Sequence, residues 1–251
     1  MQNLPNISLA IPVKNCSQFI MNLCKQIENF DYPKENLSIT FLENDSTDNS
    51  WTSCLLGTAY LSKYNYKALI CCKYNWGYNL SHTSRHLEEV QEKRLECIAK
   101  SRQMLVDISL RDNDYLYFID ADCVKFLSNT LQILLEAKAD IVVPILVLEN
   151  GSVYDYSTSI TKEGKIIYVK DMLEMYPNSK YIKVDVVNAP FMARREVFEK
   201  VKFDLNGKNQ EGPAFSAKAI EYGYNCYASL NCPVIHANIA SNLQIAKNET
   251  I

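Results

Sequence analysis

Short apolar runs alternate with amphipathic segments along the first 148 residues, and this alternation constrains the fold more than any other feature of the sequence. Runs such as ISLAIPV and LSITFL read as buried strands that lead into polar loops. Segments with apolar residues at helical spacing lie between such runs. Strands that alternate with helices at this pitch predict an α/β fold with one Rossmann-like, mostly parallel sheet flanked by helices. The expected strands cover 7–13, 37–42, 67–74, 114–122 and 140–148, and the expected helices cover 19–30, 88–110 and 127–139.

The pattern is less regular after residue 148. Here we expect a strand pair with a turn near 162–165, a strand that enters a helix within 184–201, and a short helix at 212–224. The sequence therefore predicts one domain over 1–251 with two halves. The half at 1–148 carries the parallel sheet, and the half at 149–251 adds a smaller mixed sheet.

Charge and composition exclude several classes of partner. The chain has 26 Lys plus Arg against 29 Asp plus Glu, so its net charge of −3 gives no general attraction for nucleic acid or anionic membranes. No window approaches the roughly 18 apolar residues that a membrane span needs. Nine cysteines, an odd number without CxxC spacing, favour a reduced compartment. We expect no membrane segment and a cytoplasmic location for the chain as given, although a chain trimmed of an anchor would look the same.

One buried strand runs into two aspartates, in YLYFIDADCV at 115–124. Asp120 and Asp122 are two residues apart, a spacing that points both side chains to the same face of a strand. Two adjacent carboxylates repel each other unless a positive group lies between them. Mg²⁺ and Mn²⁺ are commonly bound by one or two carboxylates together with substrate phosphates. The pair therefore predicts a site for a divalent cation and a diphosphate, and the alternative is a strand-end turn with two solvated acids.

Longer stretches resemble a known family. FDYPKENLSITFLENDSTDNSW, RLECIAKSRQMLV, DYLYFIDADCV, ADIVVP and EGPAFSAKAIEYGYNCYASLNCPVIH are similar, in that order, to the fungal Golgi mannan-polymerase mannosyltransferases of the Anp1 type. The stretch DYLYFIDADCVKFLSNTLQILLEAKADIVVPIL also resembles, more weakly, the collagen-modifying galactosyl- and glucosyltransferases. Both resemblances imply a GT-A fold, in which a D-x-D motif binds a nucleotide-sugar diphosphate through a metal ion. They also imply that the second half supplies the acceptor wall.

The resemblance assigns the donor site to the ends of the first strands. It implies Asp122 as the direct metal ligand and as one of two catalytic residues, Asp120 as a ribose or metal contact, and Ala121 between them. Glu43 and Asp45 stand where such enzymes hold the nucleoside. The usual Asp-Asp-Gly-Ser run is Glu-Asn-Asp-Ser here, which leaves the identity of the base open. The loop after the first strand is expected to pack beside the base with Pro12, Val13 and Lys14.

Further residues complete the expected site. His236, in CPVIH, matches the late histidine that joins the metal site in many GT-A enzymes, and a neutral imidazole suits Mn²⁺ better than Mg²⁺. A structural histidine at a strand end is the alternative. Arg102 would contact the diphosphate or brace the D-x-D loop, since Arg is suited to bidentate phosphate binding, and a solvated helix charge is its alternative.

The acceptor side is expected to include Asn188, Glu211 and Gly212. Glu211 is the second expected catalytic residue, because the family carries an acidic side chain there that faces the acceptor. It would act as a base in an inverting enzyme and orient the acceptor in a retaining one. Transfer from GDP-α-mannose into an α-linkage implies retention, so we favour orientation. Capping of the following helix is a compatible structural role.

The sequence thus predicts a metal-dependent hexosyltransferase that uses Mn²⁺ or Mg²⁺ and a nucleotide-sugar donor. GDP-mannose is the favoured donor, and a UDP-sugar is the alternative. The acceptor would be a hydroxyl of a glycan or glycoprotein, while an oligomer and a lumenal Golgi location stay open. A nucleotidyltransferase is disfavoured because IPVKNCSQ, after the first strand, contains no glycine for a phosphate loop. A non-catalytic GT-A subunit is the remaining alternative.

Overall fold

The fold is that of a computed structural model, which describes residues 4–78, 88–155, 157–161, 163–203 and 212–237. Within these residues, nine strands form one sheet, in the order β3-β2-β1-β4-β10-β6-β11-β5, with β9 beside β11. The strands are β1 (Ile7–Val13), β2 (Leu37–Glu43), β3 (Ala68–Lys73), β4 (Tyr115–Phe118), β5 (Cys123–Lys125), β6 (Ile141–Leu148), β9 (Tyr181–Lys183), β10 (Phe191–Arg194) and β11 (Cys226–His236).

Most of this sheet is parallel, as predicted. β1 pairs in parallel with β2 and β4, β2 with β3, and β6 with β11. β10 is antiparallel to both β4 and β6 and lies between them, so the two halves of the chain share one sheet. The expected strand at 114–122 is shorter than predicted, because β4 ends at Phe118 and the chain turns into β5.

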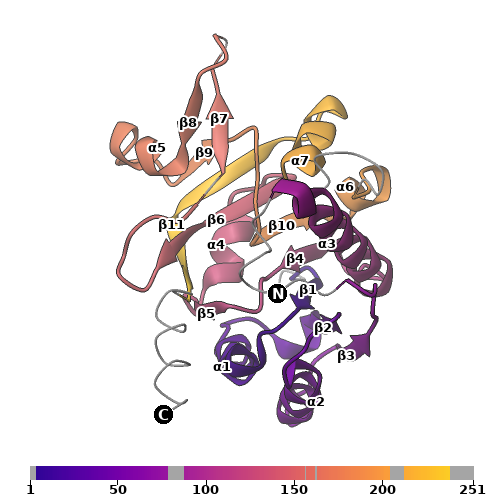
Figure 1. The fold of residues 1–251 in the computed structure, drawn as a ribbon. Helices are drawn as coiled ribbons and strands as arrows, with labels where there is room; N and C mark the ends of the chain where they lie inside the picture. Colours follow the sequence, from indigo (N-terminus) through magenta and orange to yellow (C-terminus); the bar gives the residue numbers. More distant parts are fainter. Residues whose placement is uncertain (1–3, 79–87, 156, 162, 204–211, 238–251) are drawn as a thin grey trace.

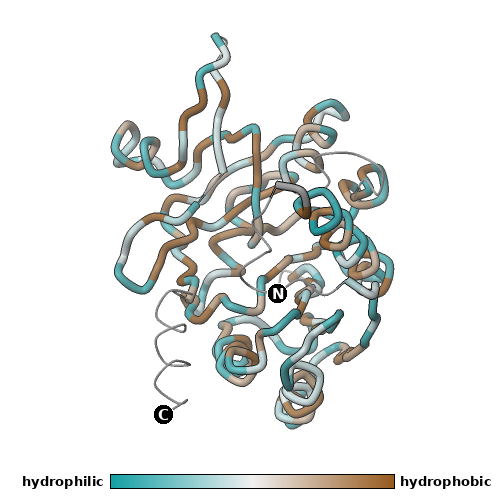
Figure 2. The backbone as a smooth tube through the Cα atoms, viewed as in Figure 1, coloured by the Kyte–Doolittle hydropathy of each residue, from teal (hydrophilic) through white to brown (hydrophobic). Residues whose placement is uncertain are grey.

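Helices cover both faces of the sheet (Figure 1). One apolar cluster packs residues of α1 (Ser17–Glu28), α2 (Ser50–Leu61) and α4 (Thr130–Glu136) on one face. A second cluster packs residues of α3 (Glu88–Ser109), α5 (Val169–Met175), α6 (Arg195–Lys200) and α7 (Gly212–Glu221) on the other. Figure 2 shows hydrophobic residues concentrated along the central strands, and both kinds of residue along the helices. Because both faces are covered, β1 and β2 are almost entirely buried, which explains why their sequences read as continuous apolar runs.

The expected strand pair of the second half is a small antiparallel sheet of β7 (Thr158–Ile160) and β8 (Ile166–Tyr168), which projects from the body in Figure 1. The strand that enters a helix within 184–201 is β10 followed by α6, as predicted. A short 3-10 helix, η1, covers Lys34–Asn36. No helix in the described ranges is long and apolar enough to span a bilayer.

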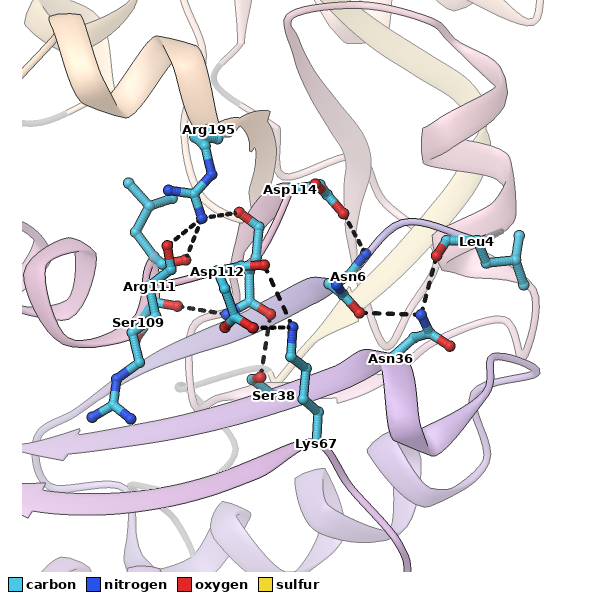
Figure 3. A network of polar contacts seen from close by, with 12 residues as sticks. Leu4, Asn6, Asn36, Ser38, Lys67, Ser109, Arg111, Asp112, Asp114 and Arg195 are labelled. Carbon is cyan, nitrogen blue, oxygen red and sulfur yellow. Dashed lines mark hydrogen bonds and ion pairs between the residues drawn. The ribbon is translucent and has the colours of Figure 1, made fainter. Parts of the chain in front are cut away.

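The amino-terminal edge of the parallel strands is closed by a polar network (Figure 3). Arg195 donates from Nη2 to the backbone carbonyls of Leu110, Arg111 and Asn113, just beyond the end of α3. The backbone N–H of Asn6 donates to Asp114 Oδ2 at 2.7 Å. Protein groups tie this edge together, which leaves the opposite, carboxyl edge as the place where loops gather around a ligand site.

Candidate active site

The D-x-D turn lies at the carboxyl edge, between β4 and β5. The backbone N–H of Ile119 donates to the carbonyl of Ala10 at 3.0 Å, and the backbone N–H of Ala237 donates to the carbonyl of Asp122 at 2.9 Å. The turn is therefore joined to the middle of β1 on one side and to the end of β11 on the other. Ala121 is buried beneath it, while Asp120 and Asp122 are partly exposed. A rigid backbone thus presents two carboxylates to the loops at this edge.

The structure brings together Asp122 and His236, the two residues that we expect to bind the metal. Asp122 Oδ2 lies 3.2 Å from His236 Nε2, and His236 Nδ1 donates to the carbonyl of Ala237 at 2.8 Å. Burial favours the neutral ring, but the hydrogen bond and the charge of Asp122 outweigh burial and raise the pKa of His236. The ring of Tyr154 lies beside the imidazole, with 5.2 Å between the ring centroids. The backbone bond at Nδ1 fixes the tautomer in which Nε2 of a neutral His236 offers its lone pair to a ligand.

This pair has the chemistry of a divalent-cation site. A carboxylate oxygen and an imidazole nitrogen that face each other at 3.2 Å are a donor set suited to Mn²⁺. No group of three His, Cys, Asp or Glu side chains is gathered for a metal in the part of the chain that the structure describes. Asp122 and His236 therefore fit a cation whose remaining ligands come from a diphosphate and water, the usual arrangement for Mg²⁺ and similar ions.

Asp120 points instead to Arg102. Arg102 Nη2 lies 3.7 Å from Asp120 Oδ1, and its guanidinium carbon lies 5.4 Å from the centre of the Phe118 ring. The Arg102 side chain is 5% exposed, whereas that of Asp120 is 33% exposed. The arginine therefore lies below the turn and pairs with Asp120, while its expected role, a brace of the turn or a diphosphate contact, stays a prediction.

Glu43, the last residue of β2, and Asp45, just after this strand, lie at the same edge, and both are buried. Glu43 accepts a hydrogen bond from the backbone N–H of Ser46 at 2.9 Å and pairs with Lys73, with 3.1 Å between Nζ and Oε2. Asp45, in a left-handed conformation with φ of 50°, accepts hydrogen bonds from the backbone N–H groups of Trp76 and Gly77 at 3.0 and 2.9 Å. These contacts fix the loops after β2 and β3, so contact with a nucleoside would use the remaining lone pairs of the carboxylates.

The loop after β1 lies beside them. Pro12 is partly exposed, Val13 is buried, and Val13 pairs in register with Glu43. Lys14 donates from Nζ to the carbonyl of Tyr78 at 2.6 Å. This bond ties the loop after β1 to the segment after β3, on the side of the D-x-D turn where we expect the base.

The residues expected on the acceptor side lie in the segment before β10 and at the start of α7. The backbone N–H of Asn188 donates to Ser157 Oγ at 3.4 Å, and that of Val187 donates to Ser216 Oγ at 3.3 Å. Gly212 is packed so closely that a Cβ there would lie 2.2 Å from the carbonyl oxygen of Val187. Asn188 and Gly212 thus lie in one packed wall, while the predicted residue Glu211 is outside the described residues.

Sequence reasoning missed three contributors to this edge. Lys73 is the cation that pairs with buried Glu43, Tyr154 lies against His236, and Asp155 is joined to β6. A charged residue that ends an apolar strand was a usable signal for Lys73. The signal for the other two was an aromatic residue followed by an acid, in VYDYS, shortly after the strand β6.

Comparisons with known proteins agree with the geometry. The Anp1 family model matches residues 1–196. A glycosyltransferase 25 family member of Anopheles gambiae is 27% identical over 190 residues, which cover 70% of this chain and 31% of the relative. One of Drosophila melanogaster is 24% identical over 239 residues, which cover 87% and 37%. The chain thus spans about a third of the length of the curated relatives it matches.

Three solved structures share the fold. GalNAc-T7 with UDP, GalNAc and Mn²⁺ has a TM-score of 0.60 at 13% identity, over 95% of this chain and 45% of that one. The mannosyltransferase PcManGT from Pyrobaculum calidifontis, in complex with GDP-Man and Mn²⁺, has a TM-score of 0.56 at 13% identity, and the match covers 94% of this chain and 57% of that one. S. aureus TarS 1–349 has a TM-score of 0.58 at 14% identity, and the match covers 92% of this chain and 60% of that one. These likenesses confirm the predicted GT-A fold.

Proposed function

Since this chain belongs to the Anp1 family, we propose that it is a nucleotide-sugar-dependent glycosyltransferase, which transfers a hexose to a hydroxyl group of a glycan or glycoprotein. The observation that carries the proposal is the pairing of Asp122 with His236 at 3.2 Å, at the carboxyl edge of a parallel sheet. Ligands of open α/β sheets bind at this edge. The D-x-D turn, the buried Arg102 below it and the loops after β1 and β2 supply a donor site of the required chemistry.

We propose GDP-mannose as the donor. Two findings support this choice: the similarity of the quoted segments to mannan-polymerase mannosyltransferases, and the shared fold with a mannosyltransferase that binds GDP-Man and Mn²⁺. A UDP-sugar is the second candidate, because both curated relatives are glycosyltransferase 25 family members and GalNAc-T7 binds UDP. The loops that contact the base decide between the two, and the run Glu-Asn-Asp-Ser after β2 departs from the common pattern in that place.

In the proposed mechanism, each residue at the carboxyl edge of the sheet would have its own role. Asp122 and His236 would hold the cation, and Arg102 would keep Asp120 in position for the ribose or the cation. A divalent cation bound there would neutralise the negative charge that develops on the departing nucleoside diphosphate. Asn188 and Gly212 would line the acceptor pocket, and Glu211 would orient the acceptor hydroxyl.

Nucleotide release by the purified chain tests the proposal. The chain would be incubated with GDP-mannose, UDP-galactose or UDP-glucose, with Mn²⁺ or with EDTA, and free GDP or UDP would be measured. We expect release from GDP-mannose that requires Mn²⁺ and falls about a thousandfold in Asp122→Asn, because transition-state charge would lose its counter-ion. Asp107→Asn, an exposed aspartate near the end of α3, is the matched control and should keep the wild-type rate.

Each other result would favour a different function. Wild-type turnover by Asp122→Asn would refute the assigned site. Release confined to UDP-sugars would favour the collagen-type alternative, and pyrophosphate from GTP or UTP would favour a nucleotidyltransferase. Nucleotide binding without any turnover would favour a non-catalytic subunit. We keep a cytoplasmic location as the proposal and a lumenal Golgi location as its alternative, which cell fractionation distinguishes.

A further inference from the structure

Residues 152–155 fold back along the edge of β6 that β11 does not occupy. The backbone N–H of Leu148 donates to the carbonyl of Ser152, and that of Tyr154 donates to the carbonyl of Leu146, both at 2.8 Å. The backbone N–H of Leu146 then donates to Asp155 Oδ2 at 3.3 Å. The N–H of Leu146 thus donates to the side chain of Asp155 where a regular strand pair would offer a backbone carbonyl. This bond holds the Asp155 carboxylate at the edge of β6.

This segment connects the metal side of the site with the acceptor side. Tyr154 lies against His236, with 5.2 Å between the ring centroids. Asp155 Oδ1 accepts a hydrogen bond from the backbone N–H of Ser157 at 2.7 Å, and Ser157 Oγ accepts one from the backbone N–H of Asn188 at 3.4 Å. Asp155 therefore stands between the residue next to the imidazole and the wall that contains Asn188.

The Asp155 carboxylate has little compensation for its charge. Among the described residues, no Lys, Arg or His forms an ion pair with it. Burial raises its pKa, against the hydrogen bonds from Ser157 and Leu146, which lower it. A buried acid with a raised pKa, fixed by backbone hydrogen bonds beside a candidate site, is a candidate for a functional residue.

We propose that Asp155 is an acceptor-binding residue, whose carboxylate accepts a hydrogen bond from a hydroxyl of the acceptor sugar. Oδ2 uses one lone pair for the backbone N–H of Leu146 and keeps another for a ligand, whereas Oδ1 faces Ser157, and the side chain is partly exposed. The two backbone bonds fix the direction of the remaining lone pairs, which makes the contact selective for hydroxyl position. The inference rests on the proposed function, because it assigns the second substrate of the same site.

Asp155→Asn is the test variant, since the amide keeps the size of the side chain, removes its charge and keeps one oxygen that accepts one of the two backbone hydrogen bonds. Asp185→Asn is the matched control. Asp185 is also partly exposed, and its Oδ2 accepts hydrogen bonds from the backbone N–H of Ile160 at 2.7 Å and from Ser159 Oγ at 3.1 Å. Asp185 thus accepts two hydrogen bonds, as Asp155 does, but its partners belong to β7 and not to the segment 152–155 beside His236.

The experiment separates transfer to an acceptor from transfer to water. GDP release from GDP-mannose is measured with Mn²⁺ alone and with methyl α-mannoside as the probe acceptor. We expect Asp155→Asn to raise the KM for the acceptor by about tenfold, the equivalent of a charge-assisted hydrogen bond of about 1.4 kcal/mol. Release without acceptor and the KM for GDP-mannose should stay within about twofold of wild type, as should every parameter of Asp185→Asn.

Two results would overturn the inference alone: an acceptor KM of wild-type size in Asp155→Asn, or an equal loss of release with and without acceptor. The first would mean that no acceptor hydroxyl contacts the carboxylate, and the second that Asp155 acts on the donor or on the fold. Wild-type protein that binds no nucleotide sugar in calorimetry would overturn the proposed function and the inference with it. The wild-type measurement therefore tells the two failures apart.

Discussion

Replacement of Gly212 by Ala tests the packing of the acceptor wall. The added Cβ would lie 2.2 Å from the carbonyl oxygen of Val187 and 3.3 Å from the Cα of Asn188, whereas real Cβ contacts are hardly ever shorter than 3.0 Å. The first turn of α7 and the segment before β10 must therefore move apart by about 0.8 Å, since neither atom can rotate away.

The size of the effect follows from these contacts. Overpacking of this kind costs about 1 to 3 kcal/mol. The movement also stretches the bond from the backbone N–H of Val187 to Ser216 Oγ, now 3.3 Å, and loss of a buried hydrogen bond adds about 1 kcal/mol. We expect a total of about 3 kcal/mol, which in a chain of this size lowers Tm by about 6 to 12 °C.

Thermal unfolding followed by circular dichroism measures this shift. Gly223→Ala, just beyond the other end of α7, is the control: its φ is 86° and no atom lies within 4 Å of an added Cβ, so only backbone strain of about 1 kcal/mol is expected. The reasoning is wrong if Gly212→Ala melts at or above the temperature of Gly223→Ala. Transfer by Gly212→Ala should fall more than donor binding, because we propose that this wall lines the acceptor pocket.

Three further variants test other contacts of the edge. Arg102→Met should lower transfer by about tenfold or more, because Asp120 loses its brace, while the free energy of unfolding changes by less than about 2 kcal/mol. Steady-state kinetics and urea unfolding would measure the two effects, and unchanged kinetics would contradict the bracing role. Lys73→Met should destabilise the protein by about 1 kcal/mol, since buried Glu43 loses a partner that is itself 39% exposed, and an unchanged urea midpoint would contradict this. Asp155→Asn should melt no lower than wild type at neutral pH. The pKa of Asp155 is raised above its ordinary 3.8, so the stability that the neutral acid contributes below pH 3.8 is lost as pH rises through the raised pKa. A clear drop in the Tm of Asp155→Asn at neutral pH would show that the backbone hydrogen bonds of the carboxylate stabilise the fold by more than its charge costs.

Much of the fold was readable from local pattern. The strands that became β1, β2 and β6 carry apolar runs because both faces of the sheet are covered there. The edge strand β3 carries a similar run although it is partly exposed, and the long helix α3 carries its apolar residues at helical spacing. Helix α2 was not predicted. Its residues, SWTSCLLGTAYL, lack one apolar stripe, and it bears polar and small side chains on its buried face, including Ser50 and Gly57.

Candidate site residues could be recognised in the sequence where a side chain able to bind metal follows or ends an expected strand. Asp122 and His236 face each other as expected, although 114 residues separate them in the sequence. Local sequence could mark Lys73 and Asp155 as residues near strand ends, but it does not specify their partners. Their partners, Glu43 and the backbone of Leu146, are brought to them only by the folded sheet.

The central claim is that a divalent cation joins the edge of this sheet to the diphosphate of a nucleotide sugar. Anomalous diffraction at the manganese edge, from crystals grown with Mn²⁺ and GDP-mannose, locates that ion directly. We predict one strong peak in contact with the Asp122 carboxylate, His236 Nε2 and the diphosphate oxygens. Clear density for the nucleotide with no anomalous peak beside Asp122 would contradict the account.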